Sequence, residues 1–192
     1  MNPIRSACVY CGAQNGILPE YSEAARRTAA ALAERDLTLV YGGGSIGLMG
    51  ILADAMLDCG GRVIGIIPRH LTAREIAHAG LTELHVVESM HERKALMMEL
   101  SDVFIALPGG IGTLEELFEV LTWSQLGLHA KPCGLLNVRG YYDTLIALLD
   151  HAVEQHFLKP QHRDLLRVDD DAARLIDGLA TPTMPARGRV DD

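Results

Sequence analysis

The chain has 192 residues, 48% of them hydrophobic, and a formal net charge of −8 at pH 7. This length and apolar content suit one globular domain with a sizeable core. The acidic balance argues against a nucleic-acid-binding protein, which needs a basic stripe, so a bound phosphate must be held locally by backbone amides and a few Arg or Lys side chains.

Strand and helix patterns alternate along the chain. Short apolar runs predict buried strands, and longer segments with one apolar face predict helices. The predicted strands are 7–10, 37–41, 62–67, 83–87, 103–107, 133–138 and, as an edge strand, 165–168. The predicted helices are 22–35 with Ser22 as its cap, one from the glycine-rich turn 42–50 to about 60, then 90–100, 114–125, 141–155, and a last aspartate-capped helix ending at 179. Residues 69–82 have no clean period, although 73–79 fit a short helix.

This alternation predicts right-handed βαβ units and an α/β fold. We expect a Rossmann-like, doubly wound parallel sheet with three α-β-α layers, forming a single domain over residues 1–180, and a disordered tail at 181–192. Ligands of such folds bind beyond the carboxyl ends of the strands, near the switch point. Both glycine-rich loops of the chain follow strands, so we expect them at this carboxyl-end edge of the sheet, the strand-end rim.

Targeting and metal signals are weak. The N-terminus lacks the apolar core of a signal peptide, and no run approaches the roughly 20 apolar residues that span a bilayer, so we expect a cytoplasmic protein. Cys8 and Cys11 match C-x-x-C, but residues three apart on a strand point to opposite faces. Cys59 and Cys133 each stand alone. We therefore expect buried structural thiols and no metal site.

The segment from Pro108 to Glu116 carries the strongest functional signal. A buried strand runs into Pro108, three glycines within four residues, Thr113 and a pair of carboxylates. Glycines let a backbone approach a ligand, and free N–H groups at a helix start attract anions. The segment lacks the lysine of a Walker loop. It also fits a T-x-x-E capping box, in which Glu116 would only bond a backbone N–H.

The second glycine loop runs from Gly42 to Gly50 and contains G-x-G-x-x-G. It follows the second strand, and the next strand does not end in the Asp or Glu that would bind a ribose, so NAD is not expected. A tight turn with close helix packing explains Gly47 and Gly50. Gly43 and Gly44 are the positions expected to approach a ligand.

Residues 88–95 place Arg93 and Lys94 near a helix N-terminus, where positive charge opposes the helix dipole. A solvated charged face is one interpretation. The position on the strand-end rim favours a ligand role for Arg93, whose guanidinium can hold phosphate or carboxylate with two bonds.

Three segments together carry a family resemblance. The segments Tyr41-Gly-Gly-Gly-Ser-Ile-Gly-Leu-Met-Gly50, Met90-His-Glu-Arg-Lys94 and Pro108-Gly-Gly-Ile-Gly-Thr-Leu-Glu-Glu116 resemble the LOG (Lonely Guy) family. Its members are cytokinin riboside 5′-monophosphate phosphoribohydrolases, often mislabelled as lysine decarboxylases. The similarity runs from Cys11-Gly12 to Gly140-Tyr-Tyr142 and so covers most of the chain.

The resemblance implies the roles of individual residues. Arg93 and Glu116 match the catalytic positions of the family. One departure concerns Ala13-Gln14, which stand where the family usually has two serines, so a hydroxyl contact to the nucleotide is missing there. The positions that match substrate contacts are Glu75, Met90, Lys94, Gly109, Gly110, Ile111, Gly112, Thr113, Leu114, Glu115 and Thr122.

The resemblance also implies an activity. We expect hydrolysis of the N-glycosidic bond of an adenosine-type 5′-monophosphate, with or without an N6 substituent, by a homodimer whose active sites lie near its interface. Cleavage develops an oxocarbenium ion that a carboxylate can stabilise. No metal, cofactor, nucleic acid or membrane partner is implied. A non-catalytic nucleotide or molybdenum-cofactor carrier of the same fold is the alternative. A lysine decarboxylase is disfavoured, because that chemistry normally uses pyridoxal phosphate held by a lysine.

Overall fold

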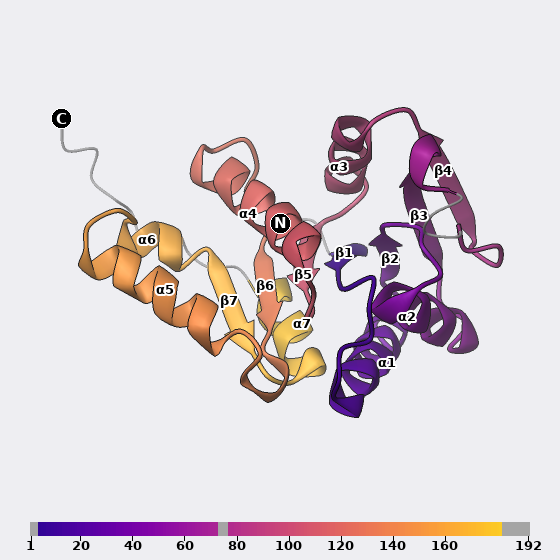
Figure 1. Ribbon diagram of the computed structural model, residues 1–192, viewed down its shortest axis with the longest axis horizontal. Coiled ribbons are helices and arrows are strands. Elements are labelled where there is room, and N and C mark those ends of the chain that lie inside the picture. The colour runs from indigo at the N-terminus through magenta and orange to yellow at the C-terminus, as the bar shows by residue number, and fades with distance from the viewer. Residues whose placement is uncertain (1–3, 73–76, 182–192) are drawn as a thin grey trace.

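The computed structural model describes residues 4–72 and 77–181. Within these residues, seven strands form one sheet in which every neighbouring pair is parallel, in the order β4-β3-β2-β1-β5-β6-β7. The predicted doubly wound parallel sheet is confirmed (Figure 1). The strands are β1 (Ser6–Tyr10), β2 (Thr38–Tyr41), β3 (Val63–Pro68), β4 (Glu83–Val87), β5 (Val103–Ala106), β6 (Cys133–Leu136) and β7 (Leu166–Asp169).

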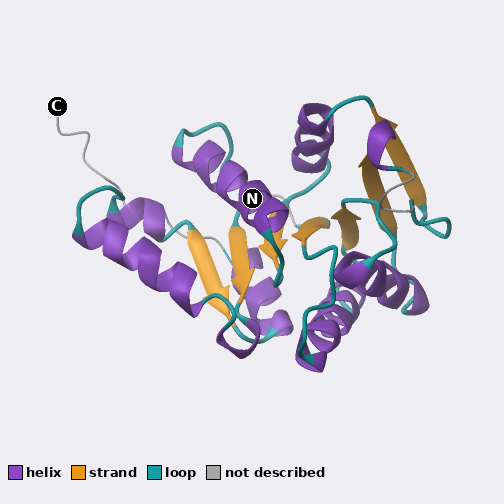
Figure 2. Ribbon diagram, viewed as in Figure 1, coloured by secondary structure: helices purple, strands orange, loops and turns teal. Residues whose placement is uncertain are grey.

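Helices cover both faces of the sheet, as Figures 1 and 2 show. One face carries α1 (Pro19–Ala33), α2 (Gly47–Asp58) and α7 (Ala172–Ala180). The other carries α3 (Met90–Glu99), α4 (Ile111–Gln125) and α5 (Asp143–Glu154). The short helix α6 (Pro160–Arg163) and two 3₁₀ turns, η1 (Arg69–Leu71) and η2 (Val138–Gly140), complete the described elements. None of the helices in the described residues is long and apolar enough to cross a membrane.

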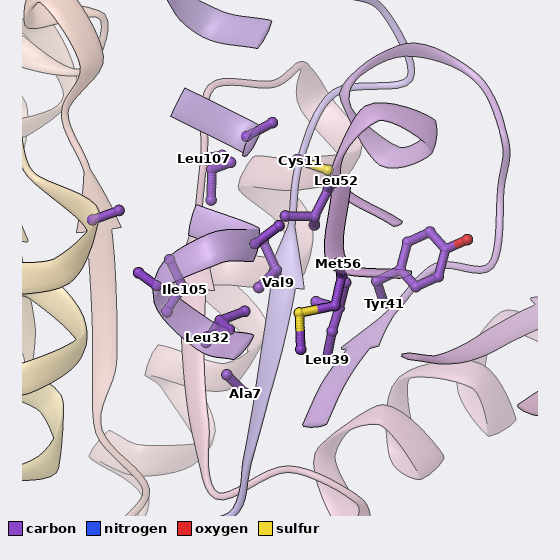
Figure 3. Packing of buried hydrophobic residues seen from close by; sticks show 14 of the residues in the cluster. Ala7, Val9, Cys11, Leu32, Leu39, Tyr41, Leu52, Met56, Ile105 and Leu107 are labelled. Carbon is purple, nitrogen blue, oxygen red and sulfur yellow. The ribbon is translucent and has the colours of Figure 1, made fainter. Parts of the chain in front are cut away.

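Alternate residues of β1 contribute to the hydrophobic clusters on the two faces of the sheet. Ala7 and Val9 belong to the cluster under α1 and α2, whereas Cys8 and Tyr10 belong to the cluster under α3 and α4. Strand residues alternate between faces, so a strand buried on both sides is apolar throughout. Figure 3 shows part of the first cluster, with Leu52 and Met56 of α2 packed against the strand residues.

Three of the four cysteines in the described residues are buried in the core. Cys8 and Cys11 are buried on opposite sides of the sheet, Cys133 is also buried, and all the cysteines are free. Cys59 is exposed because it lies just past the end of α2, so the expectation of a buried thiol is wrong there. No group of three or more potential ligands that could hold a metal ion occurs in the described part of the chain.

Helix boundaries depart from the prediction at three places. α1 begins at Pro19 and not at Ser22, because proline lacks an N–H and its fixed φ suits the first helical position. α4 begins at Ile111, three residues before the predicted start. The helix predicted over 141–155 begins at Asp143, since η2 comes first and Arg139 takes a left-handed φ of 53°.

Two further predictions involve residues that the structure does not describe. Of the predicted helix 73–79, residues 73–76 lie outside the described residues, and Ala77 forms an isolated antiparallel bridge with Gly44. Residues 182–192 of the predicted disordered tail also lie outside them. The disorder of that tail stays a prediction.

The sheet topology opens a crevice between β1 and β5. The chain leaves β1 toward α1 on one face and leaves β5 toward α4 on the other, which is the geometry of a switch point. Two backbone bonds hold the loops together at this point, Leu107 N to Tyr10 O at 2.9 Å and Gly12 N to Pro108 O at 3.1 Å.

Candidate active site

A cleft of about 510 Å³ opens at this switch point. It brings together the ends of β1, β2 and β5, the starts of α2, α3 and α4, and the two tyrosines at positions 21 and 141. The described residues lining it include Cys11, Ala13, Gln14, Asn15, Tyr21, Gly42, Met49, Leu71, Met90, Arg93, Gly109, Gly110, Gly112, Thr113, Glu115, Glu116 and Tyr141.

The N-terminus of α4 forms one side of the cleft. Gly110 is its N-cap and no side chain caps the helix, so the amides of Ile111, Gly112 and Thr113 precede the first helical bond, from Leu114 N to Gly110 O at 3.1 Å. A Cβ at Gly110 or Gly112 would meet nothing within 4 Å among the described residues, so internal packing does not require glycine there. Amides that precede the first helical bond, together with the helix dipole, favour an anion at this end of the helix.

This boundary decides between the two interpretations of Thr113 and Glu116. In a capping box the threonine is the N-cap residue and the glutamate is three residues further along. Here Thr113 is already the third helical residue and is buried, and Glu116 stands in the second turn and lines the cleft. The capping-box interpretation is therefore wrong.

Arg93 reaches the cleft from α3. Ser89 caps this helix by accepting a hydrogen bond from Glu92 N at 3.1 Å. The Arg93 side chain is only 7% exposed, and its Nη2 lies 3.6 Å from Oε1 of Glu116, which is 11% exposed. Its Nε atom is buried and has no hydrogen-bond partner in the described structure. A buried guanidinium with an unused donor is costly unless a ligand supplies the acceptor, so the solvated-face interpretation is wrong for Arg93.

Gly42 makes room for this guanidinium. A Cβ at Gly42 would collide with Nη2 of Arg93 and would lie 3.3 Å from Sδ of Met49. Gly43 instead has a φ of +75° and packs against Ile66 and Ile67 of β3. The cleft lining includes Gly42 but neither Gly43 nor Gly44, so a ligand contact for those two stays a prediction.

The chain has close relatives over most of its length. It is 52% identical over 179 residues to a cytokinin riboside 5′-monophosphate phosphoribohydrolase of Rhodococcoides fascians, covering 93% of this chain and 90% of that protein. It is 50% identical over 175 residues to one from Arabidopsis thaliana, covering 91% and 81%. Residues 49–179 match the family described as "Possible lysine decarboxylase". This chain belongs to the LOG family.

Solved structures show the same fold at lower identity. The molybdenum cofactor carrier protein of Chlamydomonas reinhardtii superposes with a TM-score of 0.68 at 20% identity, over 91% of this chain and 95% of that one. The molybdenum cofactor binding protein of Rippkaea orientalis gives 0.68 at 22% identity, over 94% and 99%. At these identities the likeness concerns the architecture alone.

Several positions that match LOG-family substrate contacts lie at the cleft. Met90 and Glu115 line it together with Gly109, Gly110, Gly112 and Thr113. Ile111 and Leu114, on the same turn of α4, are not among its lining residues; Ile111 is 86% exposed and Leu114 packs against the core. Glu75 lies outside the described residues.

Lys94 and Thr122 are not among the residues that line the cleft. Lys94 Nζ donates to Glu115 Oε1 at 2.6 Å and lies 2.9 Å from Glu119 Oε1. Burial alone would lower the pKa of Lys94, but the hydrogen bonds to these two carboxylates raise it. Thr122 Oγ1 donates to Phe118 O at 2.7 Å on the exposed side of α4. Their contact with a substrate stays a prediction.

Apart from Arg93, Glu115 and Glu116, the described residues that line the cleft carry no charge. Burial raises the pKa of Cys11 and of Tyr10 far above their ordinary values, and the charge of Glu116 adds to both shifts. These groups therefore stay neutral near pH 7. Their uncharged, poorly polarisable surroundings strengthen the field of the nearby Arg93 and Glu116 side chains.

Sequence reasoning missed Tyr21 and Tyr141 as cleft residues. Tyr141 Oη donates to Gly109 O at 2.6 Å, and the two rings meet edge to face at 5.6 Å. The Gly140-Tyr-Tyr142 segment belongs to the resemblance to the LOG family, but no local pattern pairs it with a loop 32 residues earlier.

Proposed function

We propose that this chain hydrolyses the N-glycosidic bond of adenosine 5′-monophosphates, with or without an N6 substituent, and releases the free base and ribose 5-phosphate. The observation that carries the proposal is the Arg93–Glu116 pair beside the uncapped N-terminus of α4. The relatives at 50–52% identity are named for this reaction on cytokinin riboside 5′-monophosphates.

The 5′-phosphate would bind at the start of α4. Its negative charge suits the amides of Gly110, Gly112 and Thr113 and the positive end of the helix dipole. Binding energy gained at the phosphate can be used at the distant glycosidic bond. A 5′-monophosphate should therefore react and the corresponding nucleoside should not.

Glu116 would act on the sugar. Loss of the base develops positive charge at the anomeric carbon, and a nearby carboxylate stabilises that charge or positions the attacking water. Arg93 would orient Glu116 and the sugar phosphate, since a guanidinium stays protonated and is a poor acid or base. The buried Nε of Arg93 has no hydrogen-bond partner among the described residues and could donate to the sugar phosphate.

A decarboxylase using pyridoxal phosphate fits the cleft poorly. Such an enzyme needs a lysine that can form a Schiff base with the cofactor. The chain has three lysines, and none lines the described cleft. Lys94 is paired with Glu115 and Glu119, and Lys131 Nζ donates to Met98 O at 2.6 Å.

A non-catalytic carrier is the second candidate, because molybdenum cofactor carrier proteins share the architecture. That likeness is at 20% identity, whereas the phosphoribohydrolases are at 50% or more. Since both groups share the fold, the Arg93–Glu116 pair favours the enzyme.

We further propose that the protein acts in the cytoplasm as a homodimer of single-domain chains spanning residues 1–180. Support for a dimer comes from the exposed apolar side chains Ile111 and Phe118 of α4 and Leu126 just past its end. An exposed apolar stripe beside a cleft favours contact with another protein surface.

Base-release chromatography tests the reaction. AMP, isopentenyl-AMP, GMP, CMP and adenosine are incubated side by side with the protein, and the free bases are quantified. We expect release from the adenine nucleotides and none from adenosine. Equal turnover of AMP and adenosine, or nucleotide binding with no release of any base, would overturn the proposal.

A further inference from the structure

Two consecutive tyrosines hold the loop that leads into α4. Tyr142 Oη donates to Leu107 O at 2.6 Å, and Tyr141 Oη donates to Gly109 O at the same distance. The two hydroxyls therefore donate hydrogen bonds to the carbonyls of the residues before and after Pro108. The Leu107 bond is buried, whereas Tyr141 is 42% exposed and lines the cleft.

The bond from Tyr141 fixes a peptide plane. In a trans peptide the carbonyl of one residue and the N–H of the next point to opposite sides. With the Gly109 oxygen held on the Tyr141 side, the Gly110 N–H points the other way. Gly109 and Gly110 both lack a Cβ, so without the hydroxyl this plane would be the easiest in the loop to rotate.

We propose that Tyr141 is a positioning residue for anion binding. Its hydroxyl keeps the carbonyl dipole of Gly109 out of the phosphate site and presents the Gly110 amide to the 5′-phosphate. This inference rests on the proposed function, because it assigns the anion at the start of α4 to the phosphate of the substrate.

The surroundings of Tyr141 suit this role. Its ring meets Tyr142 edge to face at 4.8 Å and Tyr21 at 5.6 Å, so it is held on two sides despite its exposure. Asn137 Oδ1 accepts from Tyr142 N at 2.8 Å and anchors the backbone of the pair. An aromatic ring held in this way needs little further ordering when the ligand binds.

The variants Tyr141→Phe and Tyr142→Phe form a matched pair, since each deletes one hydroxyl that bonds the same loop. For Tyr141→Phe we expect the KM for AMP and the dissociation constant of ribose 5-phosphate to rise roughly fivefold to tenfold, which is the size of one lost hydrogen bond. The kcat should change less than KM, and the melting temperature should stay near that of the wild type.

For Tyr142→Phe we expect the reverse pattern. The buried Leu107 carbonyl loses its partner, so the melting temperature falls while ribose 5-phosphate affinity stays within twofold. The inference is overturned if Tyr141→Phe leaves phosphate affinity unchanged, if it lowers the melting temperature as Tyr142→Phe does, or if the wild type does not bind ribose 5-phosphate.

Calorimetric binding of ribose 5-phosphate needs no turnover. If the wild type binds it, Tyr141→Phe weakens that binding and AMP is not hydrolysed, the positioning role stands and the proposed reaction fails. If AMP is hydrolysed and Tyr141→Phe binds as tightly as the wild type, the reaction stands and the positioning role fails.

Discussion

Nη2 of Arg93 lies 3.6 Å from Oε1 of Glu116, although the two residues stand 23 positions apart, on helices that follow different strands. Both helices cover the same face of the sheet, and each begins just beyond the carboxyl end of its strand. The fold thereby places a buried cation and a partly buried carboxylate next to an uncapped helix N-terminus. This relationship makes the functional proposals testable with single substitutions.

Removing the charge of Glu116 should abolish most turnover. We expect Glu116→Gln to lower kcat by roughly 100-fold to 1,000-fold, the usual cost of deleting an electrostatic group that stabilises a transition state. The fold and nucleotide affinity should be kept, because the amide has nearly the same shape. Glu119→Gln is the control, since Glu119 pairs with Lys94, does not line the described cleft and should cost far less. Full activity in Glu116→Gln would contradict the role.

Adding a methyl group at Gly42 should displace Arg93. The Cβ of Gly42→Ala would occupy the space of Nη2, so the guanidinium must move away from Glu116. We expect kcat/KM to fall at least tenfold, measured by base release, because a misplacement of about 1 Å can cost roughly 100-fold. Gly178→Ala on α7 is the control, because its Cβ would meet only Arg167 Nη1, at an ordinary 3.8 Å. Equal activity of the two variants would contradict the steric argument.

Thiol reactivity should separate Cys59 from the other cysteines. Burial raises the pKa of Cys133 to about 12 and those of Cys8 and Cys11 still higher, so these thiols are almost fully protonated at pH 8. We expect a thiol reagent to label Cys59 alone in the native protein and all four cysteines after unfolding. Labelling that persists in native Cys59→Ser would show that a buried thiol becomes accessible.

The pairing of Arg35 with Asp177 should make stability depend on pH. Arg35 donates through Nε at 2.8 Å and through Nη2 at 3.0 Å to the two carboxylate oxygens, and these bonds lower the pKa of Asp177. A lowered carboxyl pKa stabilises the folded state above the unfolded value of about 3.9. That stabilisation is lost as the pH falls through the folded value.

Because Asp177 is largely exposed, the contribution at pH 7 is on the order of 0.5 kcal/mol. We expect Asp177→Asn to lower the free energy of unfolding by this amount at pH 7 and to have no effect once the carboxyl is protonated. Urea denaturation at pH 7 and at a pH below the folded-state pKa of Asp177 measures the free energy of unfolding of both proteins. An equal loss of unfolding free energy at both pH values would mean that the charge of Asp177 is not responsible for the stabilisation.

The sequence by itself determined the fold and the location of the site. Short apolar runs such as 103–107 predict strands buried on both faces, and their alternation with amphipathic segments predicts a parallel sheet with helices on both sides. Because the carboxyl ends of parallel strands share one edge, the motifs around Arg93 and Gly110 must lie on that edge. Helix starts were harder to place, since the N-cap residues Leu18 of α1 and Gly110 of α4 form no side-chain capping bond.

Only the tertiary structure decided which residues of these motifs meet. Gly42, and not Gly43, lies against the Arg93 guanidinium because of where that side chain ends. The partners of Lys94 depend on how α3 and α4 pack. The bond from Tyr141 to Gly109 joins positions 32 residues apart. Local periodicity carries information about neighbours along the chain, whereas these contacts are set by the packing of whole elements. The sequence determined the edge of the sheet, and packing decided which side chains reach the cleft.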